Sequence, residues 1–177
     1  VDTTPLAHVR IDAAARTVTA GAGAAWHTIV PRLQREGFAV KVMQSNDDFT
    51  VGGSLAVNCH GWQQGLPPIA STVRSLRVVT ASGEVAVCTR DNEHRELFRH
   101  VLGGYGLFGI VTEATLDVVD DVYLVAKRTM TRPETYLETF LEQTADDSVG
   151  MTYGRISVSP QSFLEGASVN VLRAVPA

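Results

Sequence analysis

A pair of glycines, Gly52 and Gly53, constrains this chain more than any other feature, because it lies in the middle of the unusual segment Thr50–Gly61. Glycine has no Cβ atom, so the backbone here can come close to another molecule. Asn58–Gly61 forms a polar cluster where a strand or turn is expected to end. Such a segment suits a flat, polyanionic cofactor held largely by main-chain N–H groups. Three flanking apolar residues are predicted to lie in the core: Val51, Leu55 and Val57.

Short strands and helices are interspersed along the chain. Alternating apolar residues predict strands at 9–12, 17–19, 38–42, 73–80, 84–88, 110–119, 123–130, 151–159 and 167–173. Apolar residues at helical spacing predict helices at 25–35, from 90–92 to 102, and after a capping box at 131–134 that contains Pro133. The last of these helices has the apolar stripe Tyr136, Leu137, Phe140 and Leu141. Because strands outnumber helices, an α+β fold is favoured over a strict βαβ series.

Composition and charge narrow the classes of partner. The formal net charge is -4, which disfavours nucleic acid and anionic membranes. Cys59 and Cys88 set no disulfide framework, so a reducing, cytoplasmic location is preferred. No apolar run is long enough to span a bilayer. The chain starts at Val1 without Met, which fits a cut N-terminus and leaves a lost leader open.

Two other glycine strings partly match nucleotide-binding fingerprints. Gly104–Gly109 fits G-x-G-x-x-G, but a helix is predicted before it and a strand after it, the reverse of a nicotinamide site. It reads as a glycine-rich helix end, with a backbone packed against an adenine as the alternative. Gly21–Trp26 has the right flanks, but Trp26 replaces the third glycine and Gln44 replaces the acidic residue. This string is interpreted as a tight turn followed by a core tryptophan.

Cys59 and His60 do not form a convincing catalytic or metal site. Adjacent residues in an extended segment point to opposite faces, so they make a poor dyad. No other ligand cluster has metal spacing, and no metal is predicted. A buried cysteine beside a polar histidine is the simpler interpretation. His60 stays open as a hydrogen-bonding group near a cofactor, but no catalytic base is assigned.

The order of these segments resembles the vanillyl-alcohol oxidase and p-cresol methylhydroxylase type of flavoprotein over about residues 8–119. The similar segments are Val18–Trp26, Thr50–Leu55 through His60 and Gly61, the hairpin 73–87, and Glu96–Thr112. The resemblance implies a partial FAD-binding domain at 1–119, with a mixed or antiparallel sheet flanked by helices (a type-2 subdomain). A composition shift near residue 120 predicts that a partial substrate domain begins there and covers 120–177. Met151–Ile156 resembles the opening strand of such a domain.

The resemblance also implies FAD as the cofactor and assigns its contacts by position. The pyrophosphate and ribityl region would be lined by Thr50, Gly52, Gly53 and Ser54. The flavin ring would lie toward Asn58, His60 and Gly61. The nucleotide would contact Ser71, Thr72 and Val73, and the adenosine would meet the main chain of Gly109, Ile110 and Val111.

Two parts of the family pattern are missing from this sequence. The first FAD segment, a phosphate loop expected before Val9, is absent, and so is the rest of the substrate domain expected after Ala177. The chain is therefore expected to be an interior piece of a longer enzyme and to bind FAD weakly or not at all by itself.

The expected function is that of an FAD-dependent oxidoreductase, an oxidase or dehydrogenase that transfers a hydride from a small alcohol, amine or sugar-like substrate to flavin. Its partner would be a small molecule rather than a nucleic acid or a membrane. Two alternatives stay open. One is a non-catalytic, degenerate domain that keeps the fold for protein contacts. The other is a flavin reductase similar to the UDP-N-acetylenolpyruvoylglucosamine reductases.

Overall fold

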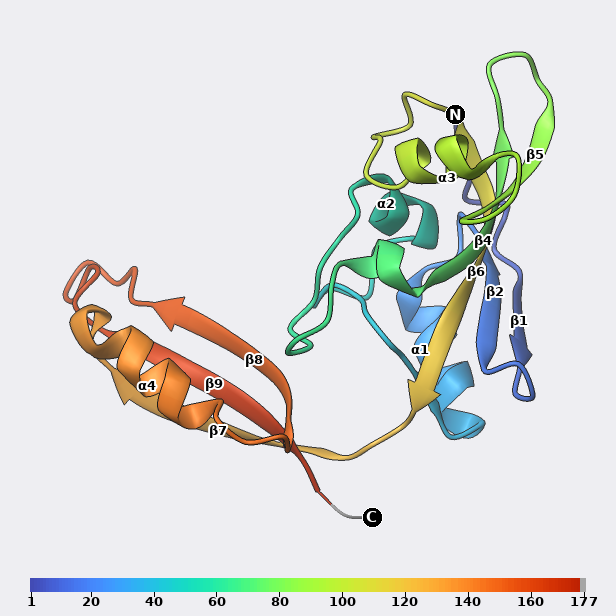
Figure 1. Cartoon of the computed structure of the whole chain (residues 1–177). Coiled ribbons are helices and arrows are strands. Elements are labelled where there is room, and N and C mark those ends of the chain that lie inside the picture. The colour runs from blue at the N-terminus through green and yellow to red at the C-terminus, as the bar shows by residue number, and fades with distance from the viewer. Residues whose placement is uncertain (176–177) are drawn as a thin grey trace. The chain divides into compact units, whose positions relative to one another are not determined.

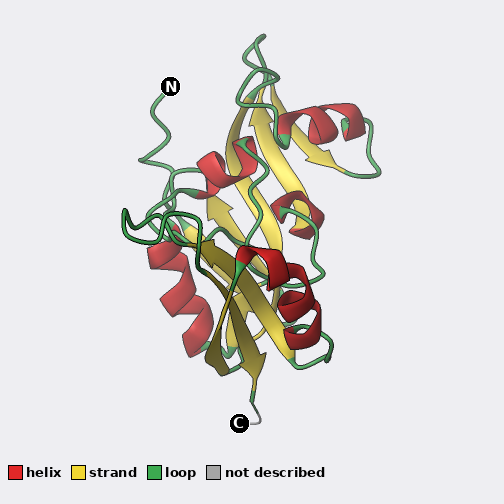
Figure 2. Cartoon of the chain, turned by 90° about the vertical axis from the view of Figure 1, so that its left-hand side faces the viewer, coloured by secondary structure: helices red, strands yellow, loops and turns green. Residues whose placement is uncertain are grey.

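The computed structural model describes residues 1–175 and divides into two compact units (Figure 1). The first unit contains residues 1–61 and 67–121. The second unit contains residues 62–66 and the chain from Val122 onward. Sheets and helices are present in both units (Figure 2), so the predicted α+β class is confirmed.

The first unit is built on an antiparallel sheet with the order β1-β2-β6-β4-β5. A sixth strand, β3, pairs with the C-terminal end of β6. Its strands are β1 (Val9–Asp12), β2 (Thr17–Gly21), β3 (Phe38–Val40), β4 (Val73–Val79), β5 (Val85–Thr89) and β6 (Ile110–Asp120). The hairpins β1–β2 and β4–β5 are predicted correctly from local alternation. β6 lies between them and pairs with both β2 and β4. The last strand of the unit therefore joins its two hairpins.

Helices cover one face of this sheet (Figure 1). They are α1 (Trp26–Arg35), α2 (Val51–Ala56) and α3 (Arg95–Val101), with a 3-10 turn η1 at Ile69–Thr72. The helix predicted at 25–35 is confirmed as α1, and Trp26, Ile29 and Leu33 on its apolar face are fully buried. These residues, with Leu55 of α2 and Phe98 of α3, form one core with the inner face of the sheet.

The second unit is a three-stranded antiparallel sheet with one helix on it. Its strands are β7 (Leu124–Thr131), β8 (Val149–Ile156) and β9 (Ala167–Ala174), in the order β7-β9-β8. A 3-10 turn η2 (Pro133–Thr135) leads into α4 (Tyr136–Gln143). The hydroxyls of Thr131 and Thr139 form a hydrogen bond at 2.9 Å. The Arg173 guanidinium donates to the carbonyl of Gln143 at 2.7 Å. These contacts hold α4 to β7 and β9.

Segment 62–66 adds an unexpected piece to the second unit. Gln63 forms an isolated antiparallel bridge with Met151 of β8. The Trp62 ring stacks on Tyr153, with ring centroids 4.0 Å apart. The sequence predicts only a loop here, because a bridge across so many residues leaves no local pattern.

The glycine-pair segment differs from its prediction. Residues 51–56 form a helix rather than the end of a strand or turn, and Val57 is 49% exposed rather than in the core. Thr50 caps this helix, since its hydroxyl accepts a bond from the Gly53 N–H. Val51 and Leu55, four residues apart, both point into the core. The helix therefore explains why Val51 and Leu55 are buried together while Val57, just after its end, is exposed.

Two helix starts were also predicted incorrectly. The Thr131 side chain does not cap α4 but bonds the hydroxyls of Thr135 and Thr139, and Leu137 and Leu141 are exposed. α3 starts at Arg95, later than expected. The reason is that the Asn92 side-chain oxygen accepts bonds from two backbone N–H groups and so forms a turn before the helix.

Gly23 is needed for close packing of the N-terminal segment. Its N–H donates to the Leu6 carbonyl, and a Cβ atom on it would collide with the backbone of Thr3. We expect Gly23→Ala to displace residues 3–6 and to cost about 1–3 kcal/mol of unfolding free energy. Chemical denaturation measures the cost, and faster protease cleavage within residues 3–8 locates it. Unchanged stability and cleavage would contradict this packing.

Candidate cofactor site

The N-terminal end of α2 is anchored to the segment that follows β2. Val51 and Gly52 donate their N–H groups to the carbonyls of Ala24 and Ala22, at 2.9 and 2.8 Å. Inside the unit, the Trp26 indole N–H donates to the Ser54 hydroxyl at 2.8 Å. α2 is therefore fixed both by backbone bonds and by a buried side-chain bond.

The C-terminal end of α2 is anchored to the glycine-rich loop 103–109. Gly103 and Tyr105 donate their N–H groups to the carbonyls of Leu55 and Ala56, at 2.9 and 3.0 Å. Gly103 has φ +78°, and this left-handed backbone turns the chain from α3 toward α2. The two glycine-rich stretches, distant in sequence, are thus joined directly by hydrogen bonds.

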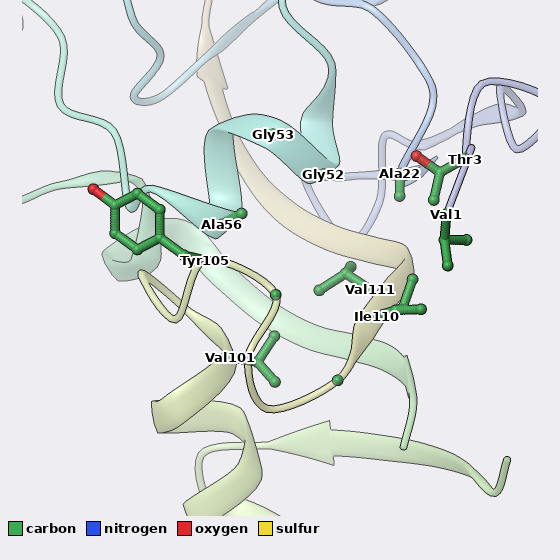
Figure 3. A pocket seen from close by; sticks show the side chains of 12 residues that line it. Val1, Thr3, Ala22, Gly52, Gly53, Ala56, Val101, Tyr105, Ile110 and Val111 are labelled. Carbon is green, nitrogen blue, oxygen red and sulfur yellow. The ribbon is translucent and has the colours of Figure 1, made fainter. Parts of the chain in front are cut away.

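A cleft of about 430 Å³ lies between α2 and this loop (Figure 3). The side chains of Ala56, Val101, Ile110 and Val111 border the space between the two elements in Figure 3. Its full lining is Val1, Thr3, Ala22, Gly52, Gly53, Ala56, Val101, Tyr105, Gly106, Gly109, Ile110 and Val111. Five of the proposed cofactor residues therefore line one cleft: Gly52, Gly53, Gly109, Ile110 and Val111.

The glycines of the cleft serve different purposes. A Cβ atom at Gly53 would meet only the Thr50 hydroxyl, at 3.4 Å, and one at Gly106 would meet nothing. A Cβ atom at Gly52 would instead press on Ala22 at 3.0 Å, and one at Gly109 would press on Val78 at 2.6 Å. Gly53 and Gly106 leave room for a ligand, whereas Gly52 and Gly109 let the protein's own elements meet.

The first turn of α2 has few free donors. Val51, Gly52 and Gly53 already donate their N–H groups to Ala24, Ala22 and Thr50. The N–H groups of Gly106 and Gly109, by contrast, have no acceptor within residues 1–175. A ligand in the cleft would therefore find close backbone at α2 and free backbone donors on the loop opposite.

A second cavity, of about 580 Å³, lies beside α2 and shares Gly53 with the cleft. Its lining is Gln44, Phe49, Gly53, Ser54, Val57, Asn58, Cys59 and His60. The Asn58 side-chain oxygen accepts the N–H of Ala70 at 3.0 Å, which fixes its side chain. The Ser54 hydroxyl lies 2.9 Å from the Gln44 side-chain oxygen and donates to it. Polar groups at one end of this cavity are thus held in place by bonds within the chain.

The other predicted site residues lie outside both cavities. Thr50 serves as the cap of α2, and Gly61 and Ser71 line neither space. Thr72 and Val73 are buried, and the Thr72 hydroxyl donates to the Ile69 carbonyl at 2.8 Å. Sequence reasoning did not select several lining residues: Ala22, Gln44, Phe49, Ala56, Cys59, Val101, Tyr105 and Gly106. Gly106 has a signal in the sequence, because it belongs to the G-x-G-x-x-G string Gly104–Gly109.

Burial raises the pKa of the Cys59 thiol, and the same cause raises the pKa of Cys88. A raised pKa leaves less thiolate at any given pH, and thiolate is the form that reacts. We expect Cys59 to be alkylated by iodoacetamide more slowly at pH 8 than a free cysteine and to react faster as the pH rises further. The fully buried Cys88 should stay unmodified in the folded protein. Mass spectrometry against pH measures both, and rapid labelling of Cys59 at pH 7 would contradict the expectation.

Residues 1–175 contain neither a metal-ion cluster nor a membrane-spanning helix. No set of three or more histidine, cysteine, aspartate or glutamate side chains there is arranged to hold a metal ion. No helix in the same residues has the length and apolar character needed to cross a membrane.

Comparisons with known proteins point to one kind of domain. A family described as "FAD binding domain" matches residues 1–89, about half of the chain. The chain is 30% identical over 119 residues to decaprenylphosphoryl-beta-D-ribose oxidase of Mycolicibacterium smegmatis, covering 66% of this chain and 26% of that protein. It is 32% identical over 115 residues to L-galactono-1,4-lactone dehydrogenase 2 of Oryza sativa subsp. japonica, covering 65% and 20%. It is 38% identical over 99 residues to cytokinin dehydrogenase 8 of Oryza sativa subsp. indica, covering 54% and 18%. The matched part therefore spans about a quarter or less of the length of these relatives.

Proposed function

The chain belongs to the FAD binding domain family, and from this premise we propose that it forms the cofactor-holding part of an FAD-dependent oxidoreductase of the vanillyl-alcohol oxidase and p-cresol methylhydroxylase type. The expectation of FAD as cofactor is confirmed by the family. The proposal extends to the activity, because the matched relatives are named as oxidases and dehydrogenases.

One observation carries the proposal: the cleft that brings Gly52 and Gly53 together with the loop from Gly106 to Val111. The residues present fit a dinucleotide. The cleft is open where Gly53 and Gly106 lack side chains, and the opposite loop offers free N–H groups at Gly106 and Gly109. Backbone donors in such a loop can hold phosphate or adenine without selective side chains.

We place the adenosine end at Gly109–Val111 and the pyrophosphate and ribityl region along Thr50–Ser54. Gly53 belongs to both cavities, so a long ligand that passes it would have one end in each. The flavin ring would then lie toward Asn58, His60 and Gly61. Among the other assigned residues, Thr72 and Val73 are buried, so any contact with the nucleotide would come through neighbouring main chain or through Ser71.

Bound FAD would supply the hydride acceptor, and the chain's own residues would bind and orient it. Phe49 and Val57 give the second cavity an apolar wall, which excludes water from a flat ring. His60 lines the same cavity; its Nδ1 lies 3.3 Å from the Gly61 carbonyl oxygen, which leaves Nε2 to donate or accept a hydrogen bond. No residue of this chain is proposed as the catalytic base.

The substrate class is proposed from the relatives' names together with the sequence. A ribose derivative, a lactone and cytokinins stand in the names of the matched relatives. We propose a small molecule with an oxidisable alcohol, amine or sugar-like C–H group, with oxygen or another acceptor receiving the electrons.

The test is the colour and spectrum of the protein purified at its natural length. We expect a yellow protein with flavin absorbance. A small alcohol, amine or sugar-like substrate should reduce the flavin and bleach this absorbance when no nicotinamide cofactor is present. A colourless protein that takes up no FAD would favour a degenerate domain used for protein contacts. Flavin reduction by a nicotinamide cofactor would favour the flavin reductase alternative.

A further inference from the structure

The second unit has one sheet face that α4 does not cover. Side chains alternate along each strand, so residues paired across strands share a face. Thr131 on β7 and Gly154 on β8 face α4, through contacts with Thr139 and Tyr136. The opposite face carries two rows of paired residues: Arg128, Asn170 and Tyr153 in one, and Met130, Ser168 and Arg155 in the other.

A cavity of about 280 Å³ lies at this face, and we call it the arginine cavity. Its lining contains two arginines, three serines and no carboxylate: Arg128, Met130, Arg155, Ile156, Ser157, Ser162, Gly166, Ala167 and Ser168. The chain as a whole has a formal net charge of -4, but the lining of this cavity carries two positive guanidinium groups and no negative group. Its charge is therefore complementary to an anion.

Arg128 is oriented by a neutral partner. Its Nε donates to the side-chain oxygen of Asn170 at 3.1 Å. Asn170 is only 5% exposed, and its amide nitrogen donates to the Tyr153 carbonyl and the Ser168 hydroxyl. This bond uses one edge of the guanidinium and leaves the terminal nitrogens for another acceptor.

Arg155 is also oriented without an acidic partner. Its guanidinium carbon lies 5.3 Å from the centre of the Tyr153 ring. Tyr153 is itself stacked on Trp62 of the segment that joins the second unit. A guanidinium that stacks on an aromatic ring uses its flat face for this contact. Its N–H groups lie in the guanidinium plane and stay free to donate hydrogen bonds.

Neither arginine forms an ion pair with any of residues 1–175. By contrast, Arg173 on the same sheet pairs with Asp146 at 3.3 Å. Arg128 and Arg155 are exposed, and each is oriented by one neutral neighbour and has unused N–H donors. Two such guanidinium groups at one cavity can bind a carboxylate or a phosphate group. Ser168, which is 5% exposed and pairs with Arg155 across the strands, adds a hydroxyl to the lining of this cavity.

We infer that the arginine cavity binds the anionic group, a carboxylate or a phosphate, of a small molecule. This inference rests on the proposed function in one respect: the small molecule is the oxidoreductase's substrate. Arg128 and Arg155 would bind the charged group of that molecule. The class of substrate is thereby narrowed to acids and phosphate esters.

The test is calorimetric titration of the natural-length protein with inorganic phosphate and, separately, with acetate. We expect saturable binding of one anion, and the tighter one distinguishes a phosphate site from a carboxylate site. Arg128→Gln and Arg155→Gln should each weaken that binding at least about tenfold. The matched control is Lys127→Gln, which removes one positive charge from the next residue of β7, on the opposite face. It should leave anion affinity within about twofold.

Two outcomes would overturn the inference: no saturable binding of either anion, or an equal loss in Lys127→Gln and the arginine variants. Flavin content, measured by absorbance on the same samples, separates this inference from the proposed function. If the arginine variants lose the anion and keep their flavin, the cavity acts as inferred. If the protein lacks flavin but binds the anion through both arginines, the anion site stands and the oxidoreductase proposal fails.

Discussion

Trp26→Ala is expected to destabilise the first unit by about 3–5 kcal/mol, the range for removing a large buried aromatic side chain. Trp26 is fully buried at the start of α1 and belongs to the core between the helices and the sheet. Its indole N–H also donates to Ser54 of α2. The substitution therefore leaves a cavity and removes the bond that ties α1 to the glycine-pair helix. Chemical denaturation followed by far-ultraviolet circular dichroism measures the loss.

Two further variants separate the cavity from the hydrogen bond. Trp26→Phe keeps an aromatic ring but removes the donor to Ser54, so about 1 kcal/mol of its cost would come from the lost bond. Trp26→Ala loses the same bond and leaves a larger cavity, so the extra cost of Trp26→Ala over Trp26→Phe measures the cavity. Leu137→Ala serves as a control for truncation at a helix surface, because Leu137 is 66% exposed, and should change stability by less than about 0.5 kcal/mol. A Trp26→Ala protein as stable as the parent would contradict the assignment of this residue to the core.

Local patterns predicted the parts of the fold that depend on neighbouring residues. The hairpins β1–β2 and β4–β5 follow from alternation around tight turns, and α1 follows from Trp26, Ile29 and Leu33 at helical spacing. α2 escaped prediction because it has six residues and two are glycine, which normally weakens a helix. Its cap and its bonds to Ala22 and Ala24 compensate, and no local pattern reveals those bonds.

Long-range pairing set the remaining limits. The position of β6 between β2 and β4 depends on contacts between distant residues, and so does the bridge from Gln63 to Met151. The candidate site follows the same rule. The glycine strings marked its backbone in advance, but lining side chains such as Ala56 and Val101 join the cleft only through the packing of α2 against the loop after α3. Composition could not distinguish the packing glycine Gly52 from the open glycine Gly53.

In the protein purified at its natural length, Gly53→Leu is expected to abolish flavin binding while the protein still folds. A side chain at Gly53 would enter the space shared by the cleft and the second cavity, and a Cβ atom there would contact only the Thr50 hydroxyl. Replacing a helical glycine also favours the helix by as much as about 1 kcal/mol. The dissociation constant for FAD should therefore rise at least tenfold, or about 1.4 kcal/mol in binding, without a loss of thermal stability of the flavin-free protein.

Smaller and neighbouring substitutions show whether the effect comes from blocking a ligand. Gly53→Ala should retain more flavin than Gly53→Leu and should be at least as stable as the parent. Gly52→Ala should instead lower the stability of the flavin-free protein. Its Cβ atom would press on Ala22 at 3.0 Å and disturb the anchoring of α2 before reaching any ligand. Flavin absorbance and the melting temperature of the flavin-free proteins distinguish the two. If Gly53→Leu bound FAD as the parent does, the ligand would have to avoid the junction at Gly53, and the proposed path of the cofactor across α2 would be wrong.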